Sequence, residues 1–173
     1  MDTLSGTATL VGLVGSESFA LTGTGTGTLA NKNAGTEAVT ASVALGTASG
    51  GALTSNYILT EPSLSSVTIG RAPLTITAAT DSKTYDGNTT SLATPTVTTG
   101  QVFSGDSLTG LSQSFNSPNA LGNNGSTLTV SSGYTLNDGN NNGGNYQVTL
   151  ATANGTISQK ALTVTGLSGT NRT

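Results

Sequence analysis

Few residues of this chain could carry out acid–base, nucleophilic or metal chemistry. Its 173 residues include no His and no Cys, which excludes Ser–His and Cys–His nucleophile systems and the usual zinc sites. A glycosidase needs two carboxyl groups held roughly 5 to 9.5 Å apart in a cleft, and no spacing in the sequence pairs any two carboxylates. We therefore expect a protein that is not an enzyme and that holds no cofactor or metal. Its eight carboxylates are Asp2, Glu17, Glu37, Glu61, Asp81, Asp86, Asp106 and Asp138.

Two other kinds of site stay open. The run Asn-Asp-Gly-Asn-Asn-Asn at 137–142 resembles an oxygen-rich calcium loop, but it has one carboxylate where an EF-hand loop has several. A Lys–Asn or Lys–Asp isopeptide bond would require Lys32, Lys83 or Lys160 together with a buried acidic catalyst. The loss of one ammonia or one water from the intact mass would reveal each such bond.

Strands and turns, rather than helices, must position these residues. Leu74, Ile76 and Ala78 follow a period of two, which predicts strands with one face in the core and one Thr-rich face in water. Pairs such as Asp86-Gly87 and Asn154-Gly155 supply the positive φ values that hairpin turns need. We expect strands near 73–79, 82–85, 92–98, 107–114, 126–131, 145–151 and 154–159, followed by another at 161–165.

The composition is that of an exposed β-protein with a thin core. Hydrophobic residues make up 34% of the chain, aromatic residues 4% and charged residues 8%, and there is no Trp. Thr favours strands, whereas Gly and Asn favour tight turns. Five Lys and Arg residues are too few for a basic patch, so we expect no nucleic-acid partner. No apolar run reaches the roughly 18 residues of a membrane helix, so we expect no membrane insertion.

Two stretches of the chain echo each other. Asn56-Tyr57 is matched by Asn145-Tyr146, and Leu74 lies 88 positions before its counterpart Leu162. A period of that size is one small β-domain rather than one turn of a thin solenoid. We therefore expect parts of a longer polypeptide: an N-terminally truncated β repeat at 1–72, a complete repeat at 73–160, and the first strand of a following repeat at 161–173.

Four pieces of sequence, in order, resemble one family. The run Lys83–Thr89 (Lys-Thr-Tyr-Asp-Gly-Asn-Thr) resembles the Lys-x-Tyr-Asp-Gly-x-Thr signature of YDG-type repeats, which occur in very large secreted bacterial adhesins of the filamentous-haemagglutinin kind. Gly144-Asn145-Tyr146 resembles the family's Gly-Asn-Tyr strand start. Residues 157–162 resemble its Ile-x-x-Lys-Ala-Leu hinge between repeats, and residues 32–36 resemble its Lys-Asn-Val-Gly-Thr segment.

The motif residues themselves favour structural roles. We expect Tyr85 to pack its ring, Asp86 to cap a turn through backbone amides, and Gly87 to take a positive φ. Tyr57 and Tyr146 stand at equivalent sites, where we expect a buried ring whose hydroxyl is bonded to backbone. A ligand contact at the Tyr-Asp-Gly turn is the alternative. The complete structural motif comprises Lys83, Tyr85, Asp86, Gly87, Asn56, Tyr57, Asn145 and Tyr146.

These observations favour an all-β fold of tandem antiparallel β-sandwich repeats, roughly immunoglobulin-like, with a β-grasp-like open sheet as the alternative. The resemblance implies a non-catalytic structural stalk of a secreted bacterial adhesin, outside the cell or on the bacterial cell surface, that supports cell adhesion or biofilm formation. The alternative function is a β module that binds glycan, matrix or another copy of itself and so contacts host or neighbouring cells.

A last expectation concerns the two ends of the repeat pattern. The first repeat lacks counterparts of residues 73–90, so its sheets should present an open edge. The strand at 161–165 belongs to a repeat that this sequence does not contain in full. We expect it either to fray or to pair with an open edge, including the edge of another molecule, by strand addition.

Overall fold

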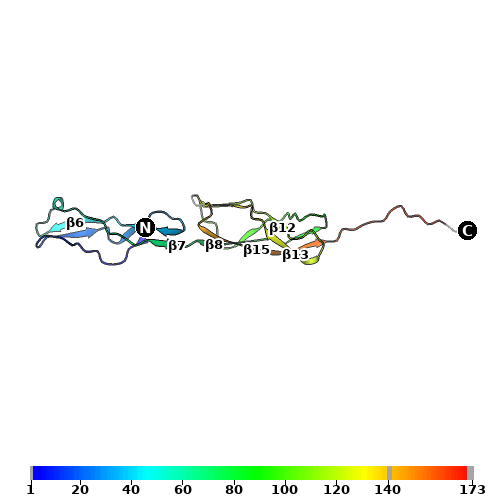
Figure 1. Cartoon of the computed structure of the whole chain (residues 1–173), viewed down its shortest axis with the longest axis horizontal. Coiled ribbons are helices and arrows are strands. Elements are labelled where there is room, and N and C mark those ends of the chain that lie inside the picture. Colours follow the sequence, from blue (N-terminus) through cyan, green and yellow to red (C-terminus); the bar gives the residue numbers. More distant parts are fainter. Residues whose placement is uncertain (1, 140–141, 171–173) are drawn as a thin grey trace. The chain divides into compact units, whose positions relative to one another are not determined.

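The computed structural model describes residues 2–139 and 142–170, and its regular structure is almost entirely β (Figure 1). A single turn of 3-10 helix, η1 (Thr54–Asn56), accompanies the strands within those ranges. The all-β prediction is therefore confirmed. The chain forms two compact units, Met1–Arg71 (unit 1) and Ala72–Thr173 (unit 2). Within the described ranges, no helix has the length and apolar character that crossing a membrane requires.

Unit 2 is built from short strands in three small sheets. The sheets have the orders β10-β8-β15, β11-β14 and β12-β13-β16-β9. Their strands alternate buried and exposed residues, as in β8, because successive side chains point to opposite faces. The strands are β8 (Ala72–Thr77), β9 (Asp81–Thr84), β10 (Thr96–Thr99), β11 (Ser107–Thr109), β12 (Gln113–Phe115), β13 (Gly122–Val130), β14 (Thr135–Asn137), β15 (Tyr146–Ala151) and β16 (Ala153–Ser158).

The prediction of purely antiparallel sheets is wrong at two pairs of strands. β15 runs parallel to β8, with Tyr146 opposite Ala72 and Val148 opposite Leu74, and β16 runs parallel to β9. A period of two shows which face of a strand is buried but carries no information on the direction of its neighbour. The sheets are consequently small and mixed, unlike the two antiparallel sheets of an immunoglobulin-like sandwich.

Two clusters of buried side chains hold unit 2 together. One cluster consists of Phe115, Leu128 and Ile157, which come from strands of the four-stranded sheet, together with Ala78, which lies between β8 and β9. There a Cβ atom on Gly155 would lie 2.6 Å from Phe115 Cε1, so only glycine lets β16 pack this closely against the Phe115 ring. The second cluster comprises Leu74, Leu136 and Tyr146, with Ala72, Val97, Val102, Leu108, Tyr134 and Val148 packed against it.

Unit 1 has shorter strands and a smaller core. Its sheets have the orders β1-β3-β5, β2-β6 and β4-β7, and all of their pairs are antiparallel. Phe19 and Ala52 are its buried hydrophobic residues. Residues 57–66 form no strand. The strands are β1 (Asp2–Thr3), β2 (Ser18–Thr22), β3 (Thr26–Leu29), β4 (Gly35–Glu37), β5 (Val39–Thr40), β6 (Ala44–Ser49) and β7 (Val67–Ile69).

Several strands of the structure differ from the predicted ones. The strand expected at 92–98 begins only at Thr96, and the one expected at 107–114 is divided into β11 and β12. β14 was not predicted, because its three residues include a single apolar side chain, Leu136, and so show no alternation. The strand expected at 161–165 is not formed, and residues 161–170 are exposed coil that has no strand partner among the described residues (Figure 1).

Candidate functional sites

The hydroxyl of Tyr146 joins the start of β15 to a turn in front of β11. It accepts a hydrogen bond from the Phe103 N–H at 2.9 Å and donates one to the Asp106 carboxylate. The Asp106 N–H in turn donates to the Phe103 carbonyl at 3.0 Å, which closes the turn. The Tyr146 ring is only 3% exposed, as predicted for this position. The expected bond to backbone is present, whereas the carboxylate partner was missed.

Unit 1 contains the same arrangement of hydrogen bonds, although the Tyr57 ring, which was also predicted to be buried, is only half-buried. The Tyr57 hydroxyl accepts a hydrogen bond from the Val14 N–H at 3.2 Å and donates one to the Glu17 carboxylate. The Glu17 N–H donates to the Val14 carbonyl at 3.1 Å. Each of these three residues lies 89 positions before its counterpart in unit 2. We call each set a Tyr–carboxylate lock; the equal spacing of the two Tyr residues and the two acids is the sequence signal that would have revealed it.

Both Tyr hydroxyls are held in their protonated form. The hydrogen bond to Glu17 raises the pKa of Tyr57 above its ordinary value. Burial, followed by the hydrogen bond to Asp106, raises the pKa of Tyr146. A hydroxyl that donates to a carboxylate loses that bond on ionisation and gains a repulsion, so the neutral form is favoured. This arrangement suits a structural lock and would disfavour a phenolate nucleophile.

The Tyr-Asp-Gly turn is organised around Lys83. Its ammonium donates to Asp86 Oδ1 at 2.9 Å, to the Asn88 carbonyl at 2.7 Å and to Asn88 Oδ1 at 2.8 Å. It also lies 5.4 Å from the centre of the Phe115 ring. The Asn88 N–H donates to Asp86 Oδ1 at 3.1 Å, and Gly87 has φ 82°, so the predicted capped turn is present. Tyr85, which we expected to pack its ring, stays 41% exposed.

The contacts of Lys83 bear on the isopeptide alternative. The hydrogen bond from Lys83, followed by that from the Asn88 N–H, holds the pKa of Asp86 below its ordinary value. Asp86 is therefore charged, and its side chain is exposed. An isopeptide bond would instead need a buried acid beside Lys83 and Asn88. The arrangement is an ion pair and a cap for the turn, and the intact mass remains the direct test for a covalent bond.

A second polar cluster ties the segment before β10 to the strand β9. Asp81 Oδ2 accepts hydrogen bonds from the Ser91 hydroxyl at 2.6 Å and the Leu92 N–H at 3.1 Å. The buried Gln113 side chain bonds both the N–H and the carbonyl of Ala79, each at 2.7 Å. Although burial acts to raise it, the hydrogen bonds from the Ser91 hydroxyl and from backbone amides, including the Leu92 N–H, hold the pKa of Asp81 below its ordinary value. Sequence reasoning missed this cluster.

The stretch at 137–142 that resembles a calcium loop lies partly outside the described residues, at 140 and 141. Asp138 is buried, and its Oδ2 accepts a hydrogen bond from the Asn145 N–H at 3.0 Å. The Asn137 side chain accepts one from the Gly139 N–H. Over the ranges that the structure describes, no group of three or more His, Cys, Asp or Glu residues is placed to hold a metal ion.

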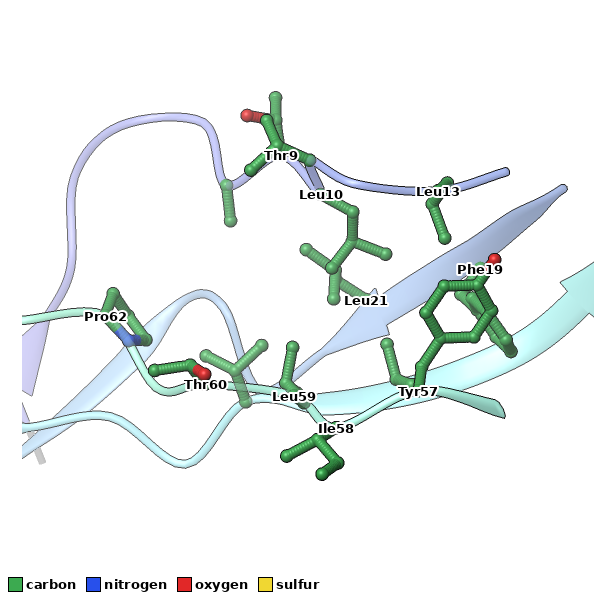
Figure 2. Close-up of a pocket in the computed structure, with 14 residues that line it drawn as sticks. Thr9, Leu10, Leu13, Phe19, Leu21, Tyr57, Ile58, Leu59, Thr60 and Pro62 are labelled. Atoms are coloured by element: carbon green, nitrogen blue, oxygen red, sulfur yellow. The ribbon is translucent and has the colours of Figure 1, made fainter. Parts of the chain in front are cut away.

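An apolar cavity of about 480 Å³ opens in unit 1. Its walls come from the segment at 8–13, from β2 and β6, and from the segment that begins at Tyr57. Figure 2 shows Leu10 and Leu13 on one side, facing Leu21 and Leu59 on the other, whereas Ile58 points away. The cavity, which we call the unit 1 groove, was not predicted as a pocket, although an open edge was expected in this unit.

The fold and these sites define a β-module whose polar side chains lock turns and strand ends. Residues 70–155 match the family model of the YDG domain, and the match includes both the Lys83–Thr89 turn and Tyr146. The chain therefore contains a YDG domain, as its resemblance to that family predicted. No curated protein and no solved structure matches the chain.

Proposed function

We propose that this chain is a structural stalk segment of a secreted bacterial adhesin, located outside the cell or on the cell surface, where it supports cell adhesion or biofilm formation without catalysing a reaction. The proposal includes tandem repeats at 1–72 and 73–160 and the start of another at 161–173. Its main support is the duplicated Tyr–carboxylate lock, whose members make the same hydrogen bonds 89 residues apart.

The use of the acidic side chains also supports a structural role. Glu17 and Asp106 accept bonds from Tyr hydroxyls, and Asp81, Asp86 and Asp138 accept bonds from nearby backbone amides. Glu61 accepts a bond from the Val43 N–H. Each such bond ties an acidic side chain to an amide or hydroxyl of the fold and so contributes to its stability. In a chain without Cys, these bonds stabilise turns that small extracellular domains often secure with disulfides.

A stalk works by adding a fixed length for every repeat. The strands β8 and β15 have six residues each, which at about 3.3 Å per residue corresponds to about 20 Å. With the loops at both ends, each repeat would add roughly 30–40 Å. Only Gly70 and Arg71 separate the end of β7 from the start of β8, which leaves little slack between successive repeats.

The stalk proposal predicts how reach grows with the number of repeats. One, two and four copies of residues 73–160 would be placed between a surface anchor and a binding head on a bacterial cell. The distance of the head from the surface should grow in proportion to the copy number. A Gly/Ser chain with the same number of residues is the matched control, and its reach should grow only as the square root of its length. Square-root growth for the repeats would refute the stalk.

The unit 1 groove favours a second candidate function, a module that binds glycan, matrix or another copy of itself. The groove is apolar and is close in size to small-molecule sites. Glycan and matrix arrays probed with the full chain test the first two partners. A saturable signal that is lost when Leu10 and Leu59 are replaced by Asp, and retained when the exposed Leu53 is replaced by Asp, would favour the binding module over the stalk.

A further inference from the structure

The first two and the last two strands of unit 2 run side by side in the same direction. β8 pairs with β15, with Ala72 opposite Tyr146, and β9 pairs with β16, with Thr84 opposite Ser158. Both pairings are parallel, and in both of them each residue lies opposite the residue 74 positions later in the chain. The four strands therefore form one ladder of constant register, which passes from the three-stranded sheet into the four-stranded sheet and which we call the parallel ladder.

Backbone hydrogen bonds continue the parallel ladder at both of its ends and between its two sheets. Three N–H groups donate to carbonyls across it at 2.8, 2.9 and 2.8 Å: Ala72 to Asn145, Ala78 to Ala151, and Tyr85 to Ser158. The second of these bonds lies at the link between the two sheets, so the pairing carries over from one sheet to the other. At about 3.3 Å per residue, the strand segment from 72 to 84 is about 40 Å long.

The core of unit 2 shields the parallel ladder from water. Its residues Leu74, Ile76 and Ile157 are buried almost completely. Water competes for the donors and acceptors of an exposed hydrogen bond, so shielded bonds are harder to replace when they are strained. Two of the four strands are also held on their other side, β8 by β10 and β16 by β13. A pull on β8 or on β16 therefore acts on a sheet and not on a lone strand.

The direction of these strands decides how tension along the chain acts on unit 2. The chain enters the parallel ladder at Ala72, directly after unit 1, and leaves it after Ser158 (Figure 1). Because the paired strands are parallel, these two points lie at opposite ends of the ladder. Tension would therefore pull the two sides of the ladder lengthwise past each other and would strain many of its hydrogen bonds at once. The strands from β10 to β14 lie outside this direct path.

We infer that the parallel ladder is a mechanical clamp that keeps unit 2 folded while the chain is under tension. The inference gives the proposed stalk the element that resists force, and it rests on that proposal for its biological purpose. Resistance to force depends on the rate of unfolding under load rather than on equilibrium stability. That rate is low when all the bonds of a ladder must yield together, and it is high when the bonds yield one after another from one end.

The Tyr-Asp-Gly turn holds the far end of the parallel ladder in place. Lys83 of β9 lies over the Phe115 ring, and the Phe115 N–H donates to the Thr89 carbonyl at 2.9 Å just after the turn. The Ser158 hydroxyl donates to the Lys83 carbonyl at 3.3 Å. For β9 to slide toward Ala72, the turn would have to leave its place beside β12. The turn thus adds resistance where the ladder ends.

Pulling single molecules of the full chain in two directions tests the clamp. The chain has no Cys, so pairs of introduced Cys residues can carry the handles. Arg71→Cys with Gln159→Cys loads the parallel ladder from opposite ends, in shear. Tyr85→Cys with Gln159→Cys is the matched control, because it loads the same ladder from one end and peels it. All three positions are exposed, so both variants should unfold thermally like the unchanged chain.

At the same loading rate, rupture in shear should need several times the force that peeling needs. Rupture in shear should also be a single step that lengthens the molecule by about 250 Å, because the residues from 72 to 158, at about 3.3–3.6 Å each, replace a ladder of about 40 Å. Equal forces in the two directions, or unfolding in shear through several small steps, would overturn the inference. Neither result bears on how reach grows with the number of repeats, so the clamp and the stalk can fail separately.

Discussion

Removing the Tyr146 hydroxyl should destabilise unit 2 by about 2 kcal/mol. Tyr146→Phe deletes one oxygen and leaves the ring in place. The Phe103 N–H then loses its acceptor at 2.9 Å, and the Asp106 carboxylate loses its donor. A neutral hydrogen bond contributes about 1 kcal/mol and one to a charged group about 1.5–3 kcal/mol. Phe103 and Asp106 are both partly exposed, so water recovers part of this sum and the lower end applies.

Thermal unfolding followed by circular dichroism measures the effect. For a unit of this size, 1 kcal/mol lowers the melting temperature by about 4–8 °C, so a fall of about 10 °C is expected. Hydrogen exchange read by mass spectrometry assigns the loss, which should appear in residues 72–160. Tyr57→Phe removes the equivalent oxygen from unit 1 and should reduce protection there, by a smaller amount because Tyr57 is less buried.

Tyr85→Phe is the matched control for this experiment. It makes the same chemical change at a side chain that is 41% exposed, so its effect should stay within about 0.5 kcal/mol. If Tyr146→Phe and Tyr85→Phe unfold at the same temperature, the Tyr–carboxylate lock does not stabilise the fold. The duplicated lock would then lose its value as the main support for a structural role.

Three further predictions concern close packing and pH. Gly155→Ala should cost about 1–3 kcal/mol, because the added Cβ would overlap Phe115, whereas Gly133→Ala, which meets nothing within 4 Å, should unfold in urea like the unchanged chain. The lowered pKa of Asp81 adds stability above the unfolded value of about 4, so the urea midpoint should fall as pH drops below it, and Asp81→Asn should flatten that dependence. The raised pKa of Tyr146 adds stability that is full below about pH 10 and lost as pH rises further, and Tyr146→Phe should remove this alkaline loss.

Local sequence patterns were sufficient for part of this fold. The Leu-Thr-Ile-Thr alternation predicted β8, and Asn145-Tyr146 marked the start of β15 within one residue. The Asp86-Gly87 pair predicted a turn with a positive φ, which Gly87 has. These features depend on residues that are neighbours in the chain, and for such features the burial pattern and the backbone preferences of single residues carry the information.

The contacts that set the direction of neighbouring strands, and those that pair distant polar side chains, could not be predicted from local sequence. Gln113 bonds the backbone of Ala79, 34 residues away, and no local pattern marks a Gln that will be buried. The Tyr146 hydroxyl meets Asp106 across 40 residues. The parallel pairing of β8 with β15 likewise depends on segments that lie far apart in the chain. In each case the partner is chosen by the folded unit rather than by adjacent sequence.

The segments that begin at Tyr57 and Tyr146 show how far a strand depends on its neighbour. In both, the Tyr follows an Asn, and its hydroxyl bonds a turn and a carboxylate. The two sets of residues lie 89 positions apart. Yet residues 146–151 form β15 beside β8, whereas residues 57–62 remain coil beside the unit 1 groove. Two differences accompany this change of state: residues 146–151 have the Leu-Thr-Ile-Thr strand β8 as a neighbour, and residues 57–62 end on Pro62, which has no N–H for a ladder, where β15 has Ala151. If the neighbour decides, a peptide of that Leu-Thr-Ile-Thr sequence, supplied to the groove, should convert residues 57–61 into a strand.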